Sequence, residues 1–236
     1  METTNIIELL YASPVLNSSL DEFFSTFWQN VLDTGLLEFT AVIFGILSVW
    51  FAKKEHILVY PTGIISVLIY VYILALPSVQ LYADAGINFF YFLMSVYGWV
   101  QWTKKDDKQE TRNISMSDKK DRLMSGITFL VSLTAIIFLL RWLKADDSNY
   151  WSTNLPYIDS FTTAVFIVAM LLMAFKKVEH WIFWIIGNII SIPLYMYKGL
   201  LFTGVQFIVF LILAVMGYAD WKRKYRQMQM KADELK

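Results

Sequence analysis

This chain of 236 residues contains seven long apolar runs. No other feature of the sequence restricts the possible folds as much. A helix needs about 20 mostly apolar residues to cross the ~30 Å hydrocarbon layer of a bilayer. The runs cover roughly residues 36–52, 57–76, 83–102, 123–143, 161–175, 181–197 and 203–221. Hydrophobic residues make up 57% of the chain and charged residues 17%, a balance that excludes an ordinary soluble enzyme. The sequence therefore predicts an all-α membrane protein with seven transmembrane helices.

The segments outside these runs have compositions of their own. Residues 1–35 mix acidic and amide side chains with aromatic ones, so we expect an N-terminal interfacial segment that is partly helical. An extra membrane helix within this segment stays open. A basic loop is expected at 103–122 and a C-terminal tail at 222–236.

Basic residues are divided unequally between the two sides that seven crossings define. With residue 1 outside, 17 of the 20 Lys and Arg residues lie inside, within 53–54, 104–122, 176–177 and 222–236. The outer side keeps three, namely Arg141, Lys144 and Lys198. Because basic loops stay in the cytoplasm, the sequence predicts an outer N-terminus and a cytoplasmic C-terminus.

The chain also contains an internal repeat. The segment Phe51-Ala-Lys-Lys-Glu-His56 is echoed by Phe175-Lys-Lys-Val-Glu-His180, and Ile64-Ile-Ser66 recurs 125 positions later as Ile189-Ile-Ser191. The ends of the third and last runs, 97–102 and 216–221, are also alike. We expect two three-helix repeats, 36–102 and 159–221, joined by a linking helix at 123–143. An odd number of helices needs one linker to restore the starting side, so the repeats are parallel, as in SWEET-type transporters.

Polar and aromatic side chains share one face of the helix expected over 181–197. Trp184, Asn188, Ser191 and Tyr195 follow each other at helical spacing. An aromatic ring beside an amide and two hydroxyls suits a flat, polar, hydrogen-bonding ligand, and the amide can both donate and accept. The alternative is that these residues join neighbouring helices, as polar residues commonly do in membranes.

Further polar residues lie within three other runs, and we include them among the candidate substrate-binding residues. They are Thr62, Ser66, Tyr70, Asn88, Tyr91 and Gln206. An unpaired amide in an apolar medium costs several kcal/mol, so Asn88 and Gln206 are expected to face protein or a water-filled cavity. Contacts between helices remain the alternative for each.

Ionisable residues are missing from the centres of the seven runs. Glu38, Asp84, Asp159 and Asp220 all lie near run ends. Proton or sodium coupling usually needs carboxylates inside the membrane, so we expect none. The chain has no Cys, no phosphate-binding loop and no pattern of catalytic residues. We therefore expect no enzyme activity, no cofactor and no metal, and the net charge of +0 argues against nucleic-acid binding.

The residues at the inner ends of the runs have simpler expected roles. His56 and His180 stand beside Lys and are expected to be solvated or interfacial. An aromatic belt at the membrane surface is expected from Trp99, Trp102, Tyr218 and Trp221.

Several of these segments together resemble the PnuC family of vitamin-precursor transporters. The matching residues are Gln80-Leu-Tyr-Ala-Asp84, Tyr97-Gly-Trp-Val-Gln-Trp102, Asp159-Ser-Phe-Thr-Thr163, Val168-Ala-Met-Leu-Leu-Met173, Val178-Glu-His-Trp181, Trp184, Asn188-Ile-Ile-Ser191, Tyr195 and Lys198-Gly199. The similarity covers roughly residues 36–222. The family's Trp-x-x-Trp-x-x-x-Asn pattern corresponds to Trp181, Trp184 and Asn188, which adds Trp181 to the candidate binding residues.

The resemblance implies a SWEET-like fold of 3+1+3 helices in a bacterial inner membrane. It implies facilitated diffusion of nicotinamide riboside into the cell, where a cytoplasmic kinase traps it, and it leaves a homo-oligomer open. Many members have Asn in place of His180, and riboside carriers often have Asn in place of Ser66. A thiamine uniporter of the same family is therefore the close alternative, and a non-transporting membrane receptor or scaffold is the alternative from another class.

Overall fold

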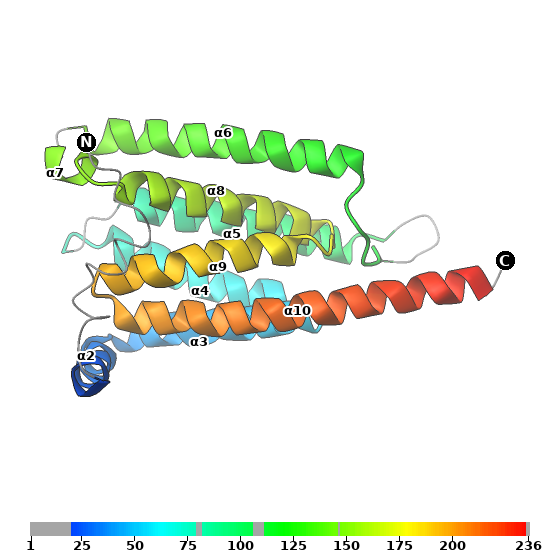
Figure 1. Ribbon diagram of the computed structural model, residues 1–236, viewed down its shortest axis with the longest axis horizontal. Coiled ribbons are helices and arrows are strands. Elements are labelled where there is room, and N and C mark those ends of the chain that lie inside the picture. The colour runs from blue at the N-terminus through cyan, green and yellow to red at the C-terminus, as the bar shows by residue number, and fades with distance from the viewer. Residues whose placement is uncertain (1–19, 79–81, 106–110, 146, 235–236) are drawn as a thin grey trace.

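The computed structural model describes residues 20–78, 82–105, 111–145 and 147–234, and these form a bundle of helices (Figure 1). The helices are α2 (Leu20–Asp33), α3 (Leu36–Lys53), α4 (Val59–Ala75), α5 (Tyr82–Thr103), α6 (Lys119–Leu143), α7 (Ser148–Trp151), α8 (Leu155–Ala174), α9 (His180–Tyr197) and α10 (Leu201–Glu234). Residues 1–19 of the expected interfacial segment, and Gln80 and Leu81 of the family resemblance, lie outside the described residues.

Five of these helices are long and apolar enough to cross a membrane, namely α3, α6, α8, α9 and α10. Helix α4 is also apolar but has 17 residues, and the 22 residues of α5 include Asp84, Asn88 and Gln101. An α-helix pairs its backbone groups within itself, which the bilayer demands of any single spanning segment. The prediction of an all-helical membrane protein is confirmed.

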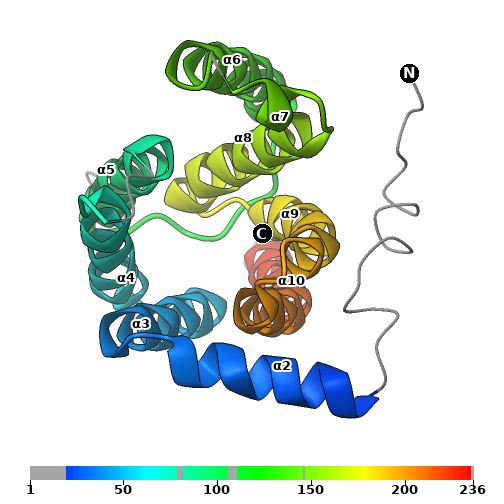
Figure 2. The same ribbon diagram turned by 90° about the vertical axis from the view of Figure 1, so that its left-hand side faces the viewer.

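Helix α2 lies across one end of the bundle (Figure 2). Its 14 residues are too few to span a bilayer. Phe24, Trp28 and Leu32 are exposed and follow each other at helical spacing, which forms an apolar face typical of helices that lie at the membrane surface. The side chain of Asn30 accepts a hydrogen bond of 3.1 Å from the backbone N–H of Leu201, which attaches α2 to the start of α10.

Three helices extend by a turn or more beyond the boundaries expected from the apolar runs. Helix α6 begins at Lys119, so the last four residues of the basic loop expected at 103–122 are helical. Helix α8 begins at Leu155 and takes Pro156 into its first turn, where the missing N–H costs little. Helix α10 continues to Glu234, so the tail expected from residue 222 is helical as far as that residue and projects from the bundle (Figure 1).

Six helices close into a ring (Figure 2). Going round it, α3 packs on α4, α4 on α5, α5 on α8, α8 on α9, α9 on α10, and α10 on α3 again. Helix α6 packs outside the ring against α8. Helices α4 and α9 lie on opposite sides, and their backbones do not pack directly on each other. Residues of α4 and α9 that interact must therefore do so across the interior of the ring.

The turns that lead into α4 and α9 have the same geometry. Glu55 and Lys176 adopt φ values of 55° and 51°, and both lie in the left-handed region. The N–H of Glu55 donates to the carbonyl of Ala52, and that of Lys176 donates to the carbonyl of Met173. Glu55 and Lys176 are 121 positions apart. The spacing of 125 inferred from sequence is therefore wrong by one helical turn at these helices, and Ser66 corresponds to Gly187, not Ser191.

A cluster of buried side chains fills the end of the ring where these turns lie, which we call the basic end because the Lys-rich segments gather there. Its members are Ala52, Val59, Tyr60, Trp102, Ile114, Met173, Val178, Trp181, Ala214 and Trp221. The indole N–H of Trp102 donates to the carbonyl of Met173 at 2.9 Å, and that of Trp221 donates to the carbonyl of Ala52 at 3.1 Å. Each hydrogen bond joins a helix of the group α3–α5 to a helix of the group α8–α10.

Two expectations about this end are wrong. Trp102 and Trp221 are buried in the cluster and do not form a surface belt, because their indole N–H groups find backbone acceptors inside. His180 is fully buried, with its Nδ1 2.7 Å from the carbonyl of Lys177 and its ring 4.4 Å from that of Trp181. The neighbouring Lys residues suggested solvent, but His180 begins α9 and faces the cluster.

Candidate functional site

The face of α9 predicted from sequence is turned into the protein. Asn188 and Ser191 are almost fully buried, and Trp184 and Tyr195 are half-buried. The spacing of these four residues along one helix therefore placed them correctly on one inward face. What the face can bind depends on the side chains that the neighbouring helices bring against it.

An aromatic column joins the two ends of this face. The ring of Trp184 stacks on Phe166 of α8 at 5.1 Å between centroids, and Phe166 stacks on Phe207 of α10 at 6.3 Å. Phe207 in turn stacks on Tyr195 at 4.9 Å. Stacked and offset aromatic rings are the surface on which a flat heteroaromatic ring binds best. We call Trp184, Phe166, Phe207 and Tyr195 the aromatic column.

A glycine makes this column possible. A Cβ atom at Gly187 would lie 2.1 Å from a ring carbon of Phe166, so any larger residue at 187 would displace the ring. Phe166 stacks on Trp184, and Trp184 lies one turn before Asn188 on the same face of α9, so the column and the amide of Asn188 share this face.

Asn188 has a polar atom without a partner. Its side chain is 2% exposed, and Oδ1 has no hydrogen-bond partner among the described residues. A buried unsatisfied amide oxygen costs about 1–3 kcal/mol, so native proteins keep few of them outside functional positions. A ligand carrying an N–H or O–H donor would satisfy this oxygen.

Three tyrosine hydroxyls from different helices form a polar layer toward the end of the ring at which α2 lies. Tyr195 of α9 lies within electrostatic reach of the carboxylates of Asp159 and Asp84 and of the hydroxyls of Tyr91 on α5 and Tyr70 on α4. Tyr70 is also hydrogen-bonded to the buried amide of Gln206 on α10. Because α4 and α9 do not pack on each other, the interaction of Tyr70 with Tyr195 spans the interior of the ring. The layer offers hydroxyl and amide groups to a polar ligand.

The remaining polar candidates are already bonded to backbone. The hydroxyl of Ser66 donates to the carbonyl of Ala41 at 2.8 Å, and that of Thr62 donates to the carbonyl of Leu58 at 2.6 Å. The Asn88 amide donates to the carbonyl of Asp84 at 3.0 Å. These contacts match the alternative role of joining or shaping helices, which is common for Ser and Thr in membranes.

Trp181 lies apart from the aromatic column. Its ring packs on Gly217, where a Cβ atom would come within 2.5 Å, and lies 5.9 Å from the ring of Trp221. The side chain is 1% exposed, and Nε1 has no partner among the described residues. The structure thus brings Trp181 into the cluster at the basic end, whereas Trp184, one turn further along, joins the column.

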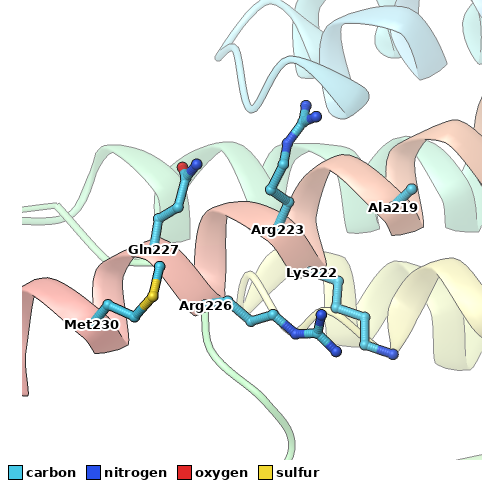
Figure 3. Close-up of a pocket in the computed structure, with 6 residues that line it drawn as sticks. All are labelled: Ala219, Lys222, Arg223, Arg226, Gln227 and Met230. Carbon is cyan, nitrogen blue, oxygen red and sulfur yellow. The ribbon is translucent and has the colours of Figure 1, made fainter.

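A surface hollow on the projecting part of α10 has different chemistry. It is lined by Ala219, Lys222, Arg223, Arg226, Gln227 and Met230 (Figure 3). All six belong to one helix, and the side chains of Arg223 and Arg226 point in opposite directions (Figure 3). Such a surface does not enclose a ligand, so the interior of the ring is the candidate site.

Sequence reasoning missed Phe166 and Phe207. A phenylalanine in an apolar helix carries no contrast with its neighbours, so nothing marked these two as inward-facing. The available signal was Gly187, because a glycine inside a membrane helix often marks a close approach by a large partner.

A ring of membrane helices with an aromatic and neutral polar interior defines a membrane carrier for a small, flat, polar solute. The comparisons with known proteins agree with this class. The sequence model of the family described as "Nicotinamide mononucleotide transporter" matches residues 35–223. The chain belongs to this family of membrane transporters, and it is a multi-pass transporter, not an enzyme.

Individual relatives are distant but cover most of the chain. The nicotinamide riboside transporter PnuC of Escherichia coli (strain K12) is 25% identical over 234 residues, which cover 87% of this chain and 96% of the relative. The riboflavin/roseoflavin transporter RibM of Streptomyces davaonensis is 25% identical over 152 residues, which cover 63% of this chain and 68% of the relative. The crystal structure of the vitamin B3 transporter PnuC superposes with a TM-score of 0.64 at 23% identity, covering 90% of this chain and 94% of that one, and so shares the fold.

Proposed function

We propose that this protein carries nicotinamide riboside into the cell by facilitated diffusion. The observation that carries the proposal is the buried, unpartnered oxygen of Asn188 beside the aromatic column. The carboxamide N–H of the riboside is the donor that this oxygen lacks. The positively charged pyridinium ring is attracted to the face of an aromatic ring at the end of the column, such as Trp184, and the ribose hydroxyls suit the layer of Tyr70, Tyr91 and Gln206.

Passive transport fits the distribution of charge. The ion pairs among the described residues lie toward the two ends of the ring, such as Lys198 with Asp159 at one end and Lys53 with Asp220 at the other. Coupled carriers usually place carboxylates within the membrane. Uptake is then driven by the riboside gradient, which a cytoplasmic kinase maintains by phosphorylating the substrate.

Uptake into liposomes that hold the purified protein tests the substrate. Labelled riboside should enter, and unlabelled riboside should compete with it. Labelled thiamine and riboflavin are the matched alternatives, the first from the sequence analysis and the second because of the similarity to RibM. Flux of either vitamin without flux of riboside would reassign the substrate within the same family. An absence of flux and of binding for all three would favour a receptor or scaffold.

We further propose that seven helices, α3 to α6 and α8 to α10, cross a bacterial inner membrane. The chain then forms two parallel repeats, α3–α5 and α8–α10, linked by α6 as in SWEET-type proteins. The matching turns at Glu55 and Lys176 support the repeat, and so do the reciprocal indole hydrogen bonds of Trp102 and Trp221.

The positive-inside rule puts the basic end in the cytoplasm and α2 on the outer side. Single cysteines in this cysteine-free chain test the orientation. Met230→Cys on the projecting part of α10 should react with an impermeant thiol reagent only from the cytoplasmic side. Ser148→Cys on α7 should react only from the outside, and the reverse pattern would invert the topology.

A further inference from the structure

An ion pair crosses the ring at its basic end. The ammonium group of Lys176 lies 2.9 Å from a carboxylate oxygen of Glu55. Glu55 stands in the turn between α3 and α4, and Lys176 stands in the equivalent turn between α8 and α9. Both side chains are largely buried, with 12% and 8% of their surface exposed. The pair therefore joins the turn before α4 to the turn before α9.

Side chains from both helix groups, α3–α5 and α8–α10, fill the basic end. The buried cluster contains Val59 and Trp102 from the first half and Met173 and Trp221 from the second. The loop that follows α5 adds Ile114, which is 2% exposed, and Ser115, whose backbone pairs with that of Lys176 and Val178. A solute in the aromatic column must pass this filled end to reach the cytoplasm.

The Glu55–Lys176 pair differs from the apolar contacts around it in how it responds to water. Burying two charges costs desolvation energy that their attraction only partly returns. When the end opens, both groups are hydrated and this cost is recovered, so the pair can part readily. Removal of one partner leaves the other charge buried in the closed state, which strongly disfavours closure. Lys224 of α10 also contacts Glu55, so Glu55 retains a partner when Lys176 is lost.

We propose that Glu55 and Lys176 form the latch that closes the cytoplasmic end of the transport path. The proposal rests on the proposed function for the direction of transport, but closure itself is measurable without any substrate. Each cycle of uptake then requires this pair to part and to form again.

Accessibility of a buried position beneath the latch tests the proposal. Val59 is 3% exposed within the cluster, and Val59→Cys introduces the only thiol of the chain. In inside-out vesicles, an impermeant maleimide should label this cysteine slowly in the parent. Glu55→Gln should raise the labelling rate about tenfold or more, since the buried Lys176 then loses its carboxylate and keeps only the ring of Trp102, 4.7 Å away. Lys176→Gln should raise the rate less, because Lys224 still neutralises Glu55.

Two controls separate the latch from a general loss of structure. Arg223→Gln removes an ion pair with Asp220 within α10 and should leave labelling at the parent rate. The double variant Glu55→Gln with Lys176→Gln should label more slowly than Glu55→Gln alone, because no charge remains stranded. Equal labelling of the parent, Glu55→Gln and Lys176→Gln would overturn the latch.

Substrate flux supplies the second measurement. Glu55→Gln should bind riboside as the parent does but take it up more slowly, because a carrier whose inner end stays open reloads poorly from outside. If the parent itself does not transport riboside, the proposed substrate fails while the labelling result still decides the latch. Faster labelling together with unchanged uptake would show that opening this end is not part of the cycle, and would also overturn the proposal.

Discussion

At the scale of single residues, burial alone does not separate binding side chains from structural ones. Asn188, Ser66 and Thr62 all lie inside the protein, but the two hydroxyls already donate to backbone carbonyls. The amide oxygen of Asn188 is buried without a partner. This difference in hydrogen bonding, which no sequence pattern displays, is the reason that we propose Asn188 as a ligand-binding residue.

Asn188→Leu should weaken binding without destabilising the protein. The variant removes an unsatisfied buried oxygen, so the ligand-free protein should unfold at the same temperature as the parent or higher. The riboside should bind roughly 5–150-fold more weakly, which corresponds to about 1–3 kcal/mol. Thermal unfolding with and without riboside measures both quantities. Ser66→Ala is the control and should keep its affinity, and normal affinity in Asn188→Leu would remove Asn188 from the site.

Gly187→Ala should damage the aromatic column. The added methyl group would overlap the ring of Phe166, and such overpacking costs about 1–3 kcal/mol of stability. The displaced ring can no longer stack on Trp184, so riboside affinity and flux should both fall. Gly126→Ala on α6 is the matched control, since no atom lies within 4 Å of a Cβ placed there. Similar effects of the two substitutions would show that the column is not sensitive to this contact.

At the scale of helices, the packing depends on small residues that receive large rings. Tyr60 lies on Gly98, Trp181 lies on Gly217, and Phe166 lies on Gly187. Without a hydrophobic force between helices in lipid, close approach at such positions supplies much of the association. At two corresponding places, a tryptophan one turn further along the helix, Trp102 or Trp221, donates a hydrogen bond to the opposite half.

Trp102→Phe and Trp221→Phe should destabilise the protein to similar extents. Each variant keeps an aromatic ring but loses one buried hydrogen bond between the halves, worth about 1 kcal/mol. Thermal unfolding in detergent measures the loss. Trp99→Phe is the control, because Trp99 is 39% exposed and should tolerate the change. A clearly larger effect of Trp99→Phe than of the other two would contradict a joining role for the buried pair.

At the scale of the whole molecule, ring closure places neutral polar and aromatic groups inside and ion pairs near the ends. Tyr70 and Tyr195 face the interior from opposite sides of the ring, while Glu55 and Lys176 meet at its basic end. In the proposed carrier, the solute binds in the interior between these ends. The charged groups then act on access to that interior.

Riboside flux should not respond to proton or sodium gradients. Among the described residues, the carboxylates of the ring helices lie near the starts of α3, α5 and α8 or from Asp220 onward on α10, so none lies midway between the two ends of the ring to exchange a coupling ion with the solute. Uptake into proteoliposomes should proceed at the same initial rate after either gradient is collapsed, and it should stop at equal concentrations. Accumulation above that equilibrium would refute facilitated diffusion.

Much of the fold could be predicted because the length of an apolar run indicates whether it forms a membrane-spanning helix. The run over 181–197 became α9, and its polar spacing identified the inward face that carries Trp184 and Asn188. The pattern at Gly98 and Gly217, each followed four residues later by Trp, could have indicated buried tryptophans. It was interpreted as a surface belt because aromatic residues near helix ends usually lie there.

The sequence by itself determined the class of this protein, its helical segments and the asymmetry of its basic residues, because the bilayer imposes length and charge rules on each segment separately. Only the tertiary structure decided which polar groups are free to bind. It brought Phe166 and Phe207 into the column, satisfied Ser66 through Ala41, and set Glu55 against Lys176. These outcomes depend on contacts between helices distant in sequence, and the spacing within one helix holds no information about what faces it.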